Sequence, residues 1–421
     1  MGKSIKFRLI VMSFLQFFVW GAWLITIANY WFDTKHWGPA EFGGVFSTLG
    51  LSSLFMPALT GIIADRWINV EKLYGILHLF GGIVLLFLPF VETSNHFFWV
   101  IFLAMVFYMP TISLSNSIGY TVLKNHQFDV IKVFPPIRVW GTIGFIAAMW
   151  FTNLTGNKAS ANQFVIAGIA AIALAIYSFT LPKCPPTNTT KAEKRSLVEI
   201  MGLDSFKLFG TYKMALFFLF SMLLGAALQL TNMYGDLYLS EFKNIPRYTD
   251  SVVVKYSTVI MSISQISETL FILAIPFFLK RFGIKQVMLI SMFAWVLRFG
   301  LFAFGNPEEN LWMIITSCIV YGMAFDFFNI SGSLFVETST DSKIRSSAQG
   351  LFMMMTNGVG AIMGSYISGW IIEQFFILEN GAKDWYHIWL SFAGYALVVS
   401  ILFAAFFRHK HNPAELSEFS H

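Results

Sequence analysis

The stretch MPALTGIIADRW, Met56 to Trp67, joins the end of an apolar run to a charged turn. The run begins near residue 41, so it is long enough to cross a bilayer, which takes about 20 apolar residues in a helix. Asp65 and Arg66 close the run, and a second apolar run begins near residue 71. This pattern predicts a hairpin of two membrane-spanning helices joined by a short polar turn.

The same alternation of apolar runs and polar turns fills the whole chain. Of its 421 residues, 56% are hydrophobic and only 12% are charged, whereas soluble domains carry about 25% charged residues. The first run, 6–31, is too long for the core of a cleavable signal peptide. We therefore expect an all-α integral membrane protein in a lipid bilayer, and we interpret the net charge of +5 as no evidence for nucleic-acid binding.

The hydropathy pattern predicts twelve transmembrane helices in two six-helix halves. The expected ranges are 6–31, 41–65, 71–91, 97–121, 136–154, 163–181, 212–238, 253–279, 284–304, 311–336, 345–373 and 385–407. A long polar stretch divides them. It predicts an N-terminal half at 1–181, a cytoplasmic linker at 182–211, a C-terminal half at 212–408 and a cytoplasmic tail at 409–421.

The distribution of basic residues predicts the orientation of the chain in the membrane. Of the 28 Lys and Arg residues, 20 lie in the loops on the side shared by both termini, and 6 lie in the opposite loops. Because cytoplasmic loops carry an excess of Lys and Arg, we expect both termini and the 182–211 linker in the cytoplasm.

The two halves repeat each other in sequence. The fourth and tenth helices match at a constant offset of 213 residues, through the pairs Trp99/Trp312, Tyr108/Tyr321, Asn116/Asn329 and Gly119/Gly332. The first and seventh helices match at an offset of 204, which pairs Gly21 with Gly225. Repeats of this kind predict a substrate site at mid-depth between the halves, with alternating access around it.

Ionisable residues inside the predicted helices are the strongest sign of function. Each costs several kcal/mol at bilayer depth and usually faces the interior of the bundle. Four qualify: Arg138, Glu268, Arg298 and Asp326. We interpret Arg298 as structural, because no polar residue shares its helix face. We expect Glu268 or Asp326 to carry a coupled proton, and Glu268 is favoured because Gln265 lies one turn away.

Other polar and aromatic residues lie on the same helix faces as these ionisable groups. The spacings i, i+3, i+4 and i+7, which define one face of a helix, connect Arg138 with Thr142 and Phe145, Gln229 with Asn232, Gln265 with Glu268, and Tyr321 with Phe325. Amides, carboxylates and guanidinium groups suit ribose hydroxyls, and aromatic rings suit a planar base. Only Arg138 is placed to bind a phosphate, so an uncharged solute with a flat ring is favoured over a nucleotide.

The chain also resembles known transporters. GIIADRW and the following Lys72 resemble the signature between the second and third helices of the major facilitator superfamily, in which Asp65 and Arg66 would act as a conformational latch. Longer strings are similar to the nucleoside:proton symporter family: SFLQFFVWGAWL (Ser13 to Leu24), FPPIRVWGTIGFI (Phe134 to Ile146), IMSISQISETLFIL (Ile260 to Leu273), YGMAFDFFNISGS (Tyr321 to Ser333) and SAQGLFMMMTNG (Ser347 to Gly358).

This resemblance implies a protein that imports nucleosides such as uridine and adenosine with protons across the bacterial cytoplasmic membrane. It implies the major facilitator fold, function as a monomer, no cofactor and no metal. It also implies a central site made of the residues grouped above. The sequence departs from the family at Ala227, where the family carries a carboxylate.

Three alternatives remain open from the residues. The first is a symporter for a sugar or a free nucleobase, or a drug exporter. The second is a membrane-embedded enzyme, which is disfavoured because the chain has no catalytic His/Asp string, metal-ligand cluster or phosphate loop. The third is a receptor that does not transport.

Overall fold

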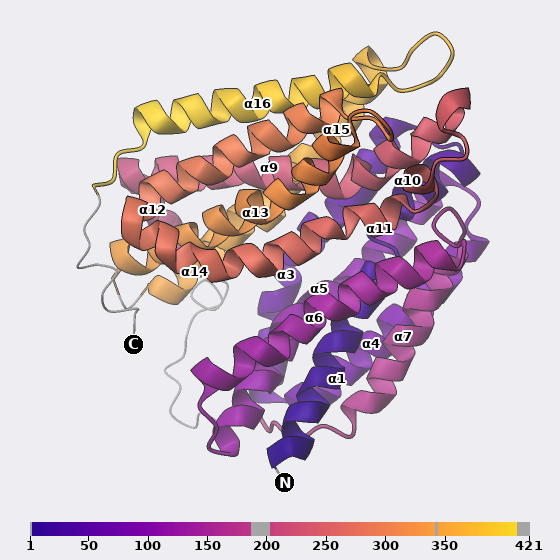
Figure 1. Cartoon of the computed structure of the whole chain (residues 1–421). Helices are drawn as coiled ribbons and strands as arrows, with labels where there is room; N and C mark the ends of the chain where they lie inside the picture. Colours follow the sequence, from indigo (N-terminus) through magenta and orange to yellow (C-terminus); the bar gives the residue numbers. More distant parts are fainter. Residues whose placement is uncertain (1, 187–202, 342–343, 411–421) are drawn as a thin grey trace. The chain divides into compact units, whose positions relative to one another are not determined.

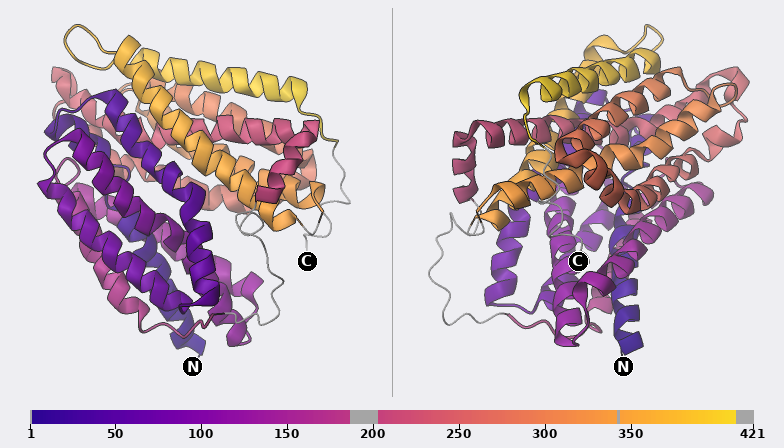
Figure 2. Two further views of the ribbon diagram at one scale, coloured as in Figure 1. Left: turned by 180° about the vertical axis from the view of Figure 1, so that it is seen from behind. Right: turned by 60° about the vertical axis from the view of Figure 1, so that its left-hand side comes forward.

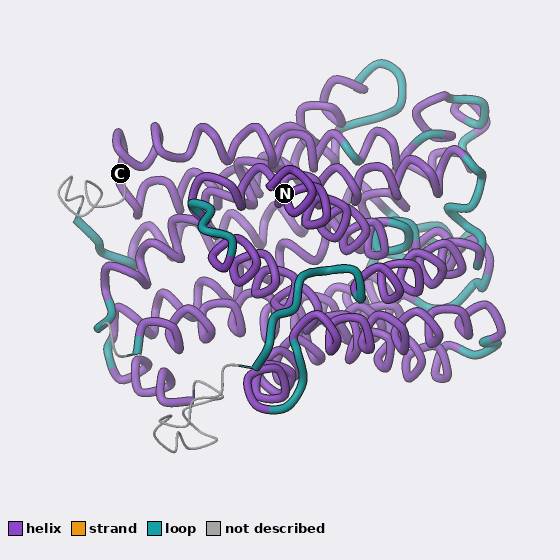
Figure 3. The backbone as a smooth tube through the Cα atoms, turned by 90° about the horizontal axis from the view of Figure 1, so that it is seen from below, coloured by secondary structure: helices purple, strands orange, loops and turns teal. Residues whose placement is uncertain are grey.

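Helices make up nearly all of the described chain. The computed structural model describes residues 2–186, 203–341 and 344–410. Within these ranges the only pairing of the β type is one isolated bridge between Ile377 and Lys383, and Figure 3 shows helices joined by short loops. Since a helix satisfies its own backbone hydrogen bonds, it is the form that apolar runs of this length take in lipid.

The first compact unit covers Met1–Ser196. In chain order its elements are α1 (Gly2–Gly21), α2 (Ile27–Asn29), η1 (Tyr30–Thr34), α3 (Pro39–Arg66), α4 (Val70–Phe87), η2 (Leu88–Phe90), α5 (Ser94–Asn125), α6 (Val130–Leu154) and α7 (Asn162–Ser178). The first span consists of α1, α2 and η1 together, and η1 is a π-helix. Helix α1 packs beside α6, and α4 packs beside α5 and α7 (Figures 1 and 2).

The second compact unit covers Leu197–His421. Its elements are η3 (Leu203–Gly210), α9 (Tyr212–Glu241), η4 (Phe242–Asn244), η5 (Pro246–Tyr248), α10 (Val252–Lys255), α11 (Ser257–Met261), α12 (Ile263–Phe304), α13 (Leu311–Ser339), α14 (Arg345–Met353), η6 (Met354–Gly360), α15 (Ala361–Phe375) and α16 (Trp385–Phe406). Helix α16 lies beside α12 and α9 (Figure 1).

These elements make the twelve predicted spans. Among the described residues, nine helices are long and apolar enough to cross a membrane. One of them, α12, forms two spans, because it bends at Gly283, whose φ is 77°. Glycine adopts a positive φ without steric cost. The eleventh span is divided into α14, η6 and α15, and the sixth is the shorter helix α7. The expected fold class is confirmed.

Glycines bring the same pair of spans together in each unit. A Cβ at Gly21 of α1 would collide with the backbone carbonyl oxygen of Phe145 in α6, and a Cβ at Gly225 of α9 would collide with that of Thr356 in η6. Small residues allow such close approach between membrane helices. The first and fifth spans therefore pack as the seventh and eleventh do, and the glycines responsible are the pair that the repeat matched.

The beginning of the predicted linker is attached to the first unit. The backbone N–H of Cys184 donates to Oε2 of Glu71 at 2.8 Å, and the N–H of Val70 donates to the carbonyl oxygen of Cys184 at 3.0 Å. Asn69 donates to the second carboxylate oxygen of Glu71. Residues 187–202 of the predicted linker and 411–421 of the predicted tail lie outside the described residues.

Candidate functional site

In the first unit, the three predicted residues of α6 lie near aromatic side chains of α1. The guanidinium carbon of Arg138 lies 4.0 Å from the centre of the Phe17 ring. Phe145 is buried, with its ring edge-to-face to Trp20 at 6.4 Å. Thr142 lies between them along the helix and is partly exposed. This face of α6 therefore offers a cation and a hydroxyl next to aromatic rings.

In the second unit, the predicted aromatic residues form a stack. The rings of Tyr321 and Phe325 on α13 are nearly parallel, at an angle of 4° and a centroid distance of 5.8 Å. The guanidinium of Arg298 lies 4.6 Å from the Tyr321 ring. Trp295 meets the same ring edge-on. Tyr321 is thus held in place by packing, whereas Phe325 is partly exposed.

Arg298 is surrounded by hydrogen-bond acceptors from other helices. It is fully buried, and it donates to the carbonyl oxygen of Ser317 at 2.6 Å and to the hydroxyl of Thr231 at 3.3 Å. Its partners lie on α13, on α9 and, through the Ser264 hydroxyl, on the part of α12 before the bend at Gly283, so the residues on its own helix face did not predict them. These contacts give Arg298 a structural role in holding Tyr321.

Three predicted site residues have buried oxygen atoms without a hydrogen-bond donor among the described residues. They are Oε1 of Gln229 on α9, Oε1 of Gln265 on α12 and Oδ2 of Asp326 on α13. Buried polar atoms are normally paired, and leaving one unpaired costs about 1–3 kcal/mol. All three lie on helices of the second unit, where a polar ligand or water could supply the donors.

The two predicted carboxyl groups are brought together by a glycine. A Cβ at Gly322 of α13 would lie 2.7 Å from the backbone nitrogen of Glu268 on α12, so these helices touch at this point. Asp326 follows Gly322 by about one turn, so the two predicted carboxyl residues lie on helices that touch between them.

The remaining predicted residues are less well defined by the geometry. Asn232 on α9 is partly exposed. Asp65 and Arg66 are both exposed at the end of α3, and no hydrogen bond or ion pair of either side chain occurs within the described residues. Their role as a conformational latch stays a prediction.

Two buried polar features escaped the sequence analysis. Asp236 is buried on α9 and accepts a hydrogen bond from Thr258 at 2.9 Å. Asp236 lies i+7 from Gln229 and i+4 from Asn232, so the spacing that placed those two residues on one helix face could also have identified Asp236. In the first unit, Oε1 of Gln16 accepts from Tyr74 at 2.6 Å and lies 2.8 Å from Nε2 of His78. That network joins α1 and α4, and spacing along one helix does not predict it.

Twelve spans in two units, with buried amides and carboxylates at mid-helix positions, define a secondary transporter of the major facilitator type. Similar proteins agree. The chain is 49% identical to the xanthosine permease of Escherichia coli, covering 98% of each chain. It is 48% identical to the nucleoside permease NupG of the same organism, covering 97% of each chain.

A crystal structure of the nucleoside transporter NupG matches with a TM-score of 0.90, covering 96% of this chain and all of that one. A bacterial homologue of the lysosomal transporter Spinster matches with a TM-score of 0.70 at 13% identity, which shows the fold alone. The family model described as nucleoside H+ symporter matches residues 3–412. The chain belongs to the nucleoside H+ symporter family. It is a multi-pass membrane transporter and not an enzyme.

Proposed function

We propose that this transporter carries nucleosides, among them uridine, adenosine and xanthosine, into the cell together with protons by alternating access. It acts as a monomer in the bacterial cytoplasmic membrane, with both termini in the cytoplasm. The residues proposed to contact the substrate are Arg138, Thr142 and Phe145 in the first unit, and Gln229, Asn232, Gln265, Glu268, Tyr321 and Phe325 in the second. Asp65 and Arg66 form the latch on the cytoplasmic side.

The observation that carries this proposal is the set of unpaired buried oxygens beside aromatic residues of the second unit. Oxygens of Gln229 and Gln265 can each accept a hydrogen bond from a ribose hydroxyl. The partly exposed ring of Phe325, already stacked on Tyr321, can receive a planar base on its other face. A ligand with both a hydroxylated sugar and a flat ring satisfies both features.

Proton coupling is assigned to the pair Glu268 and Asp326. The two residues lie on helices that touch at Gly322, and a charged carboxylate is costly at bilayer depth, so uptake of a proton by one of the pair lowers that cost. Glu268 is the favoured carrier, because Gln265 lies one turn away and links the proton to the ligand. Asp326 is the more deeply buried of the two side chains.

The first experiment measures uptake of radiolabelled uridine, adenosine and xanthosine by cells that express the protein, with and without a protonophore. We expect accumulation that the protonophore abolishes. Competition with free ribose and with free nucleobases separates nucleoside transport from sugar or base transport. Stronger inhibition by free ribose or by a free base than by nucleosides would contradict the proposal.

The coupling residues are tested in proteoliposomes with Glu268→Gln and Asp326→Asn. A coupling residue, once neutralised, loses nucleoside accumulation driven by an imposed pH difference but keeps energy-independent exchange. Asp250→Asn, at an exposed position after η5, is the matched control and keeps both activities. If both variants still concentrate nucleoside against its gradient, neither carboxylate carries the proton.

A further inference from the structure

A small cavity in the second unit extends the candidate site along α13. It is partly open to its surroundings and is lined by residues of α9, α12, α13 and η6, including Leu224, Leu228, Trp295, Phe325, Asn329 and Asn357. Phe325 belongs both to this cavity and to the substrate site, and Leu228 immediately precedes Gln229. The cavity therefore adjoins two of the proposed substrate-site residues, Phe325 and Gln229. Its volume is about 20 Å³, which is room for about one water molecule, so it suits a single polar group at the edge of a ligand.

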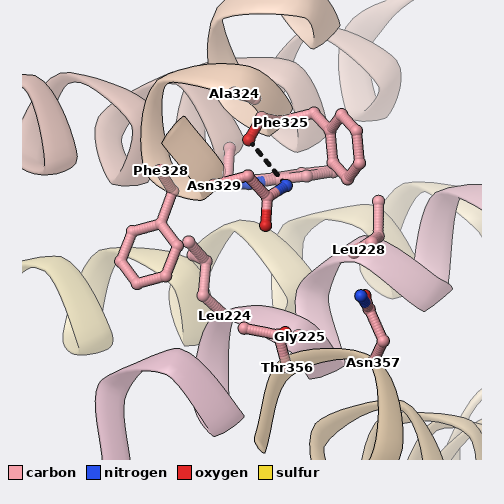
Figure 4. Close-up of a pocket in the computed structure, with 10 residues that line it drawn as sticks. Leu224, Gly225, Leu228, Ala324, Phe325, Phe328, Asn329, Thr356 and Asn357 are labelled. Carbon is pink, nitrogen blue, oxygen red and sulfur yellow. Dashed lines mark hydrogen bonds between the residues drawn. The ribbon is translucent and has the colours of Figure 1, made fainter. Parts of the chain in front are cut away.

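Two carboxamides face this cavity from different helices. Figure 4 shows Asn329 on α13 and Asn357 on η6 pointing into the same space, with Leu228 of α9 at its side. The amide nitrogen of Asn329 donates to the carbonyl oxygen of Phe325 in its own helix at 3.1 Å. The amide nitrogen of Asn357 has only the sulfur of Met353, at 3.9 Å, as a partner within the described residues. Both carboxamide oxygens remain available for a ligand.

The local backbone explains how Asn357 reaches the cavity. Gly225 allows α9 to touch the backbone at Thr356, which leaves the next residue, Asn357, at the cavity beside Leu228. Asn357 lies in the π-helix η6, where an extra residue is accommodated in the helical turn. Single π-helical turns occur frequently at functional sites. Asn329 is two turns beyond Tyr321, on the face that also carries Phe325.

The chemistry of these residues selects the polar edge of a nucleobase. A carboxamide has a donor and an acceptor side by side, which match the adjacent acceptor and donor on a base such as adenine. Phe325 and Trp295 add aromatic surface for the base plane. We propose that Asn329 and Asn357 form a base-recognition subsite that distinguishes nucleosides by the groups on their base edge. This proposal rests on the proposed function and names the part of the ligand that the sequence analysis left without a polar partner.

The test compares adenosine with purine riboside, which lacks the 6-amino group. Half-maximal inhibition of uridine uptake is measured for each compound in proteoliposomes with the unmodified chain, Asn329→Leu and Asn357→Leu. We expect the unmodified protein to bind adenosine more tightly than purine riboside. Each variant loses about 5-fold or more in adenosine affinity, with little change for purine riboside, since one good carboxamide–base pair is worth roughly 5- to 150-fold.

Asn244→Leu makes the same substitution at an exposed position outside the cavity and serves as the control. If Asn329→Leu does not reach the membrane, Asn357→Ala decides the question, because the one described hydrogen bond of the Asn357 side chain is long. An unchanged preference for adenosine in both Asn357 variants, with normal uridine uptake, would overturn the subsite alone. Absence of any nucleoside uptake by the unmodified chain would instead overturn the proposed function.

Discussion

Gln229 and Gln265 keep polar atoms inside the bundle without a partner from the described chain. Each forgoes a hydrogen bond that a folded protein usually makes. Since an unpaired buried group is destabilising, its energy is recovered when a ligand donates to it. The empty site is therefore less stable than a fully paired one, and binding of the ligand gains the free energy of the missing hydrogen bonds.

Replacing Gln265 or Asn232 with Ala removes a partner for a ligand hydroxyl. We expect a loss of about 1–3 kcal/mol in binding free energy, or roughly 5- to 150-fold in dissociation constant. Calorimetric titration of purified protein with uridine measures the loss directly. Unchanged dissociation constants in both variants, at normal expression and stability, would remove these two residues from the site.

Cys184 allows a pH test of the attached linker. Burial, and to a smaller degree the nearby carboxylate of Glu71, raise the pKa of its thiol to about 12. The thiolate is the reactive form, so the thiol is protonated and unreactive below that value, and its reactivity rises only as the pH approaches 12. An unperturbed thiol has a pKa of about 8.5.

Maleimide labelling of a Cys318→Ala variant reports Cys184 alone. At pH 8 we expect labelling of the folded protein on the order of 10³-fold slower than of the protein unfolded in detergent, since raising the pKa of the thiol from about 8.5 to about 12 reduces the thiolate fraction by roughly that factor. Labelling of the folded protein as fast as of the unfolded one would show that residues 182–186 are not held against Glu71.

At the scale of elements, the limits of the helices are well predicted but their internal breaks are not. The predicted ranges 41–65 and 311–336 correspond to α3 and α13, with ends that differ by a few residues. They agree because hydropathy shows both the apolar run and the polar residues at its ends. The π-helices η1 and η6 differ from α-helices only in backbone hydrogen bonding. Hydropathy carries no information about that difference, so the position of Asn357 at the cavity was not foreseen.

The bend in α12 gives a prediction at this scale. Gly283 has a φ of 77°, whereas Gly300, in the same helix, has helical geometry and open space where a Cβ would lie. Gly283→Ala should lower the melting temperature in detergent, with a cost of about 1 kcal/mol or more for a side chain at positive φ. Gly300→Ala should be neutral or raise it, since Ala favours a helix interior by roughly 0.5–1 kcal/mol. Equal shifts for the two variants would contradict the bend.

For the whole molecule, the sequence alone was enough to predict the twelve spans and the fold class, whereas the bounds of the two halves and the residues of the site stay predictions. Spacing along one helix correctly grouped Tyr321 with Phe325, because neighbours on a helix face are determined locally. Contacts between helices were less accessible. Arg298 forms hydrogen bonds with Thr231 and Ser317, and Gln16 forms one with His78. These contacts depend on which helices pack together, and spacing along one helix does not predict that.

The matched glycine contacts have a consequence for how such a protein diverges over time. Gly21 and Gly225 each meet only backbone atoms of the opposite helix, so any side chain at either position is blocked. The residues that supply those backbone atoms, Phe145 and Thr356, are not restricted in their side chains by this contact, and they differ. A substitution at this joint is therefore excluded at the glycine and permitted by the contact at the facing residue. The same joint occurs in both units, with an aromatic residue facing the glycine in one and a small hydroxyl residue in the other.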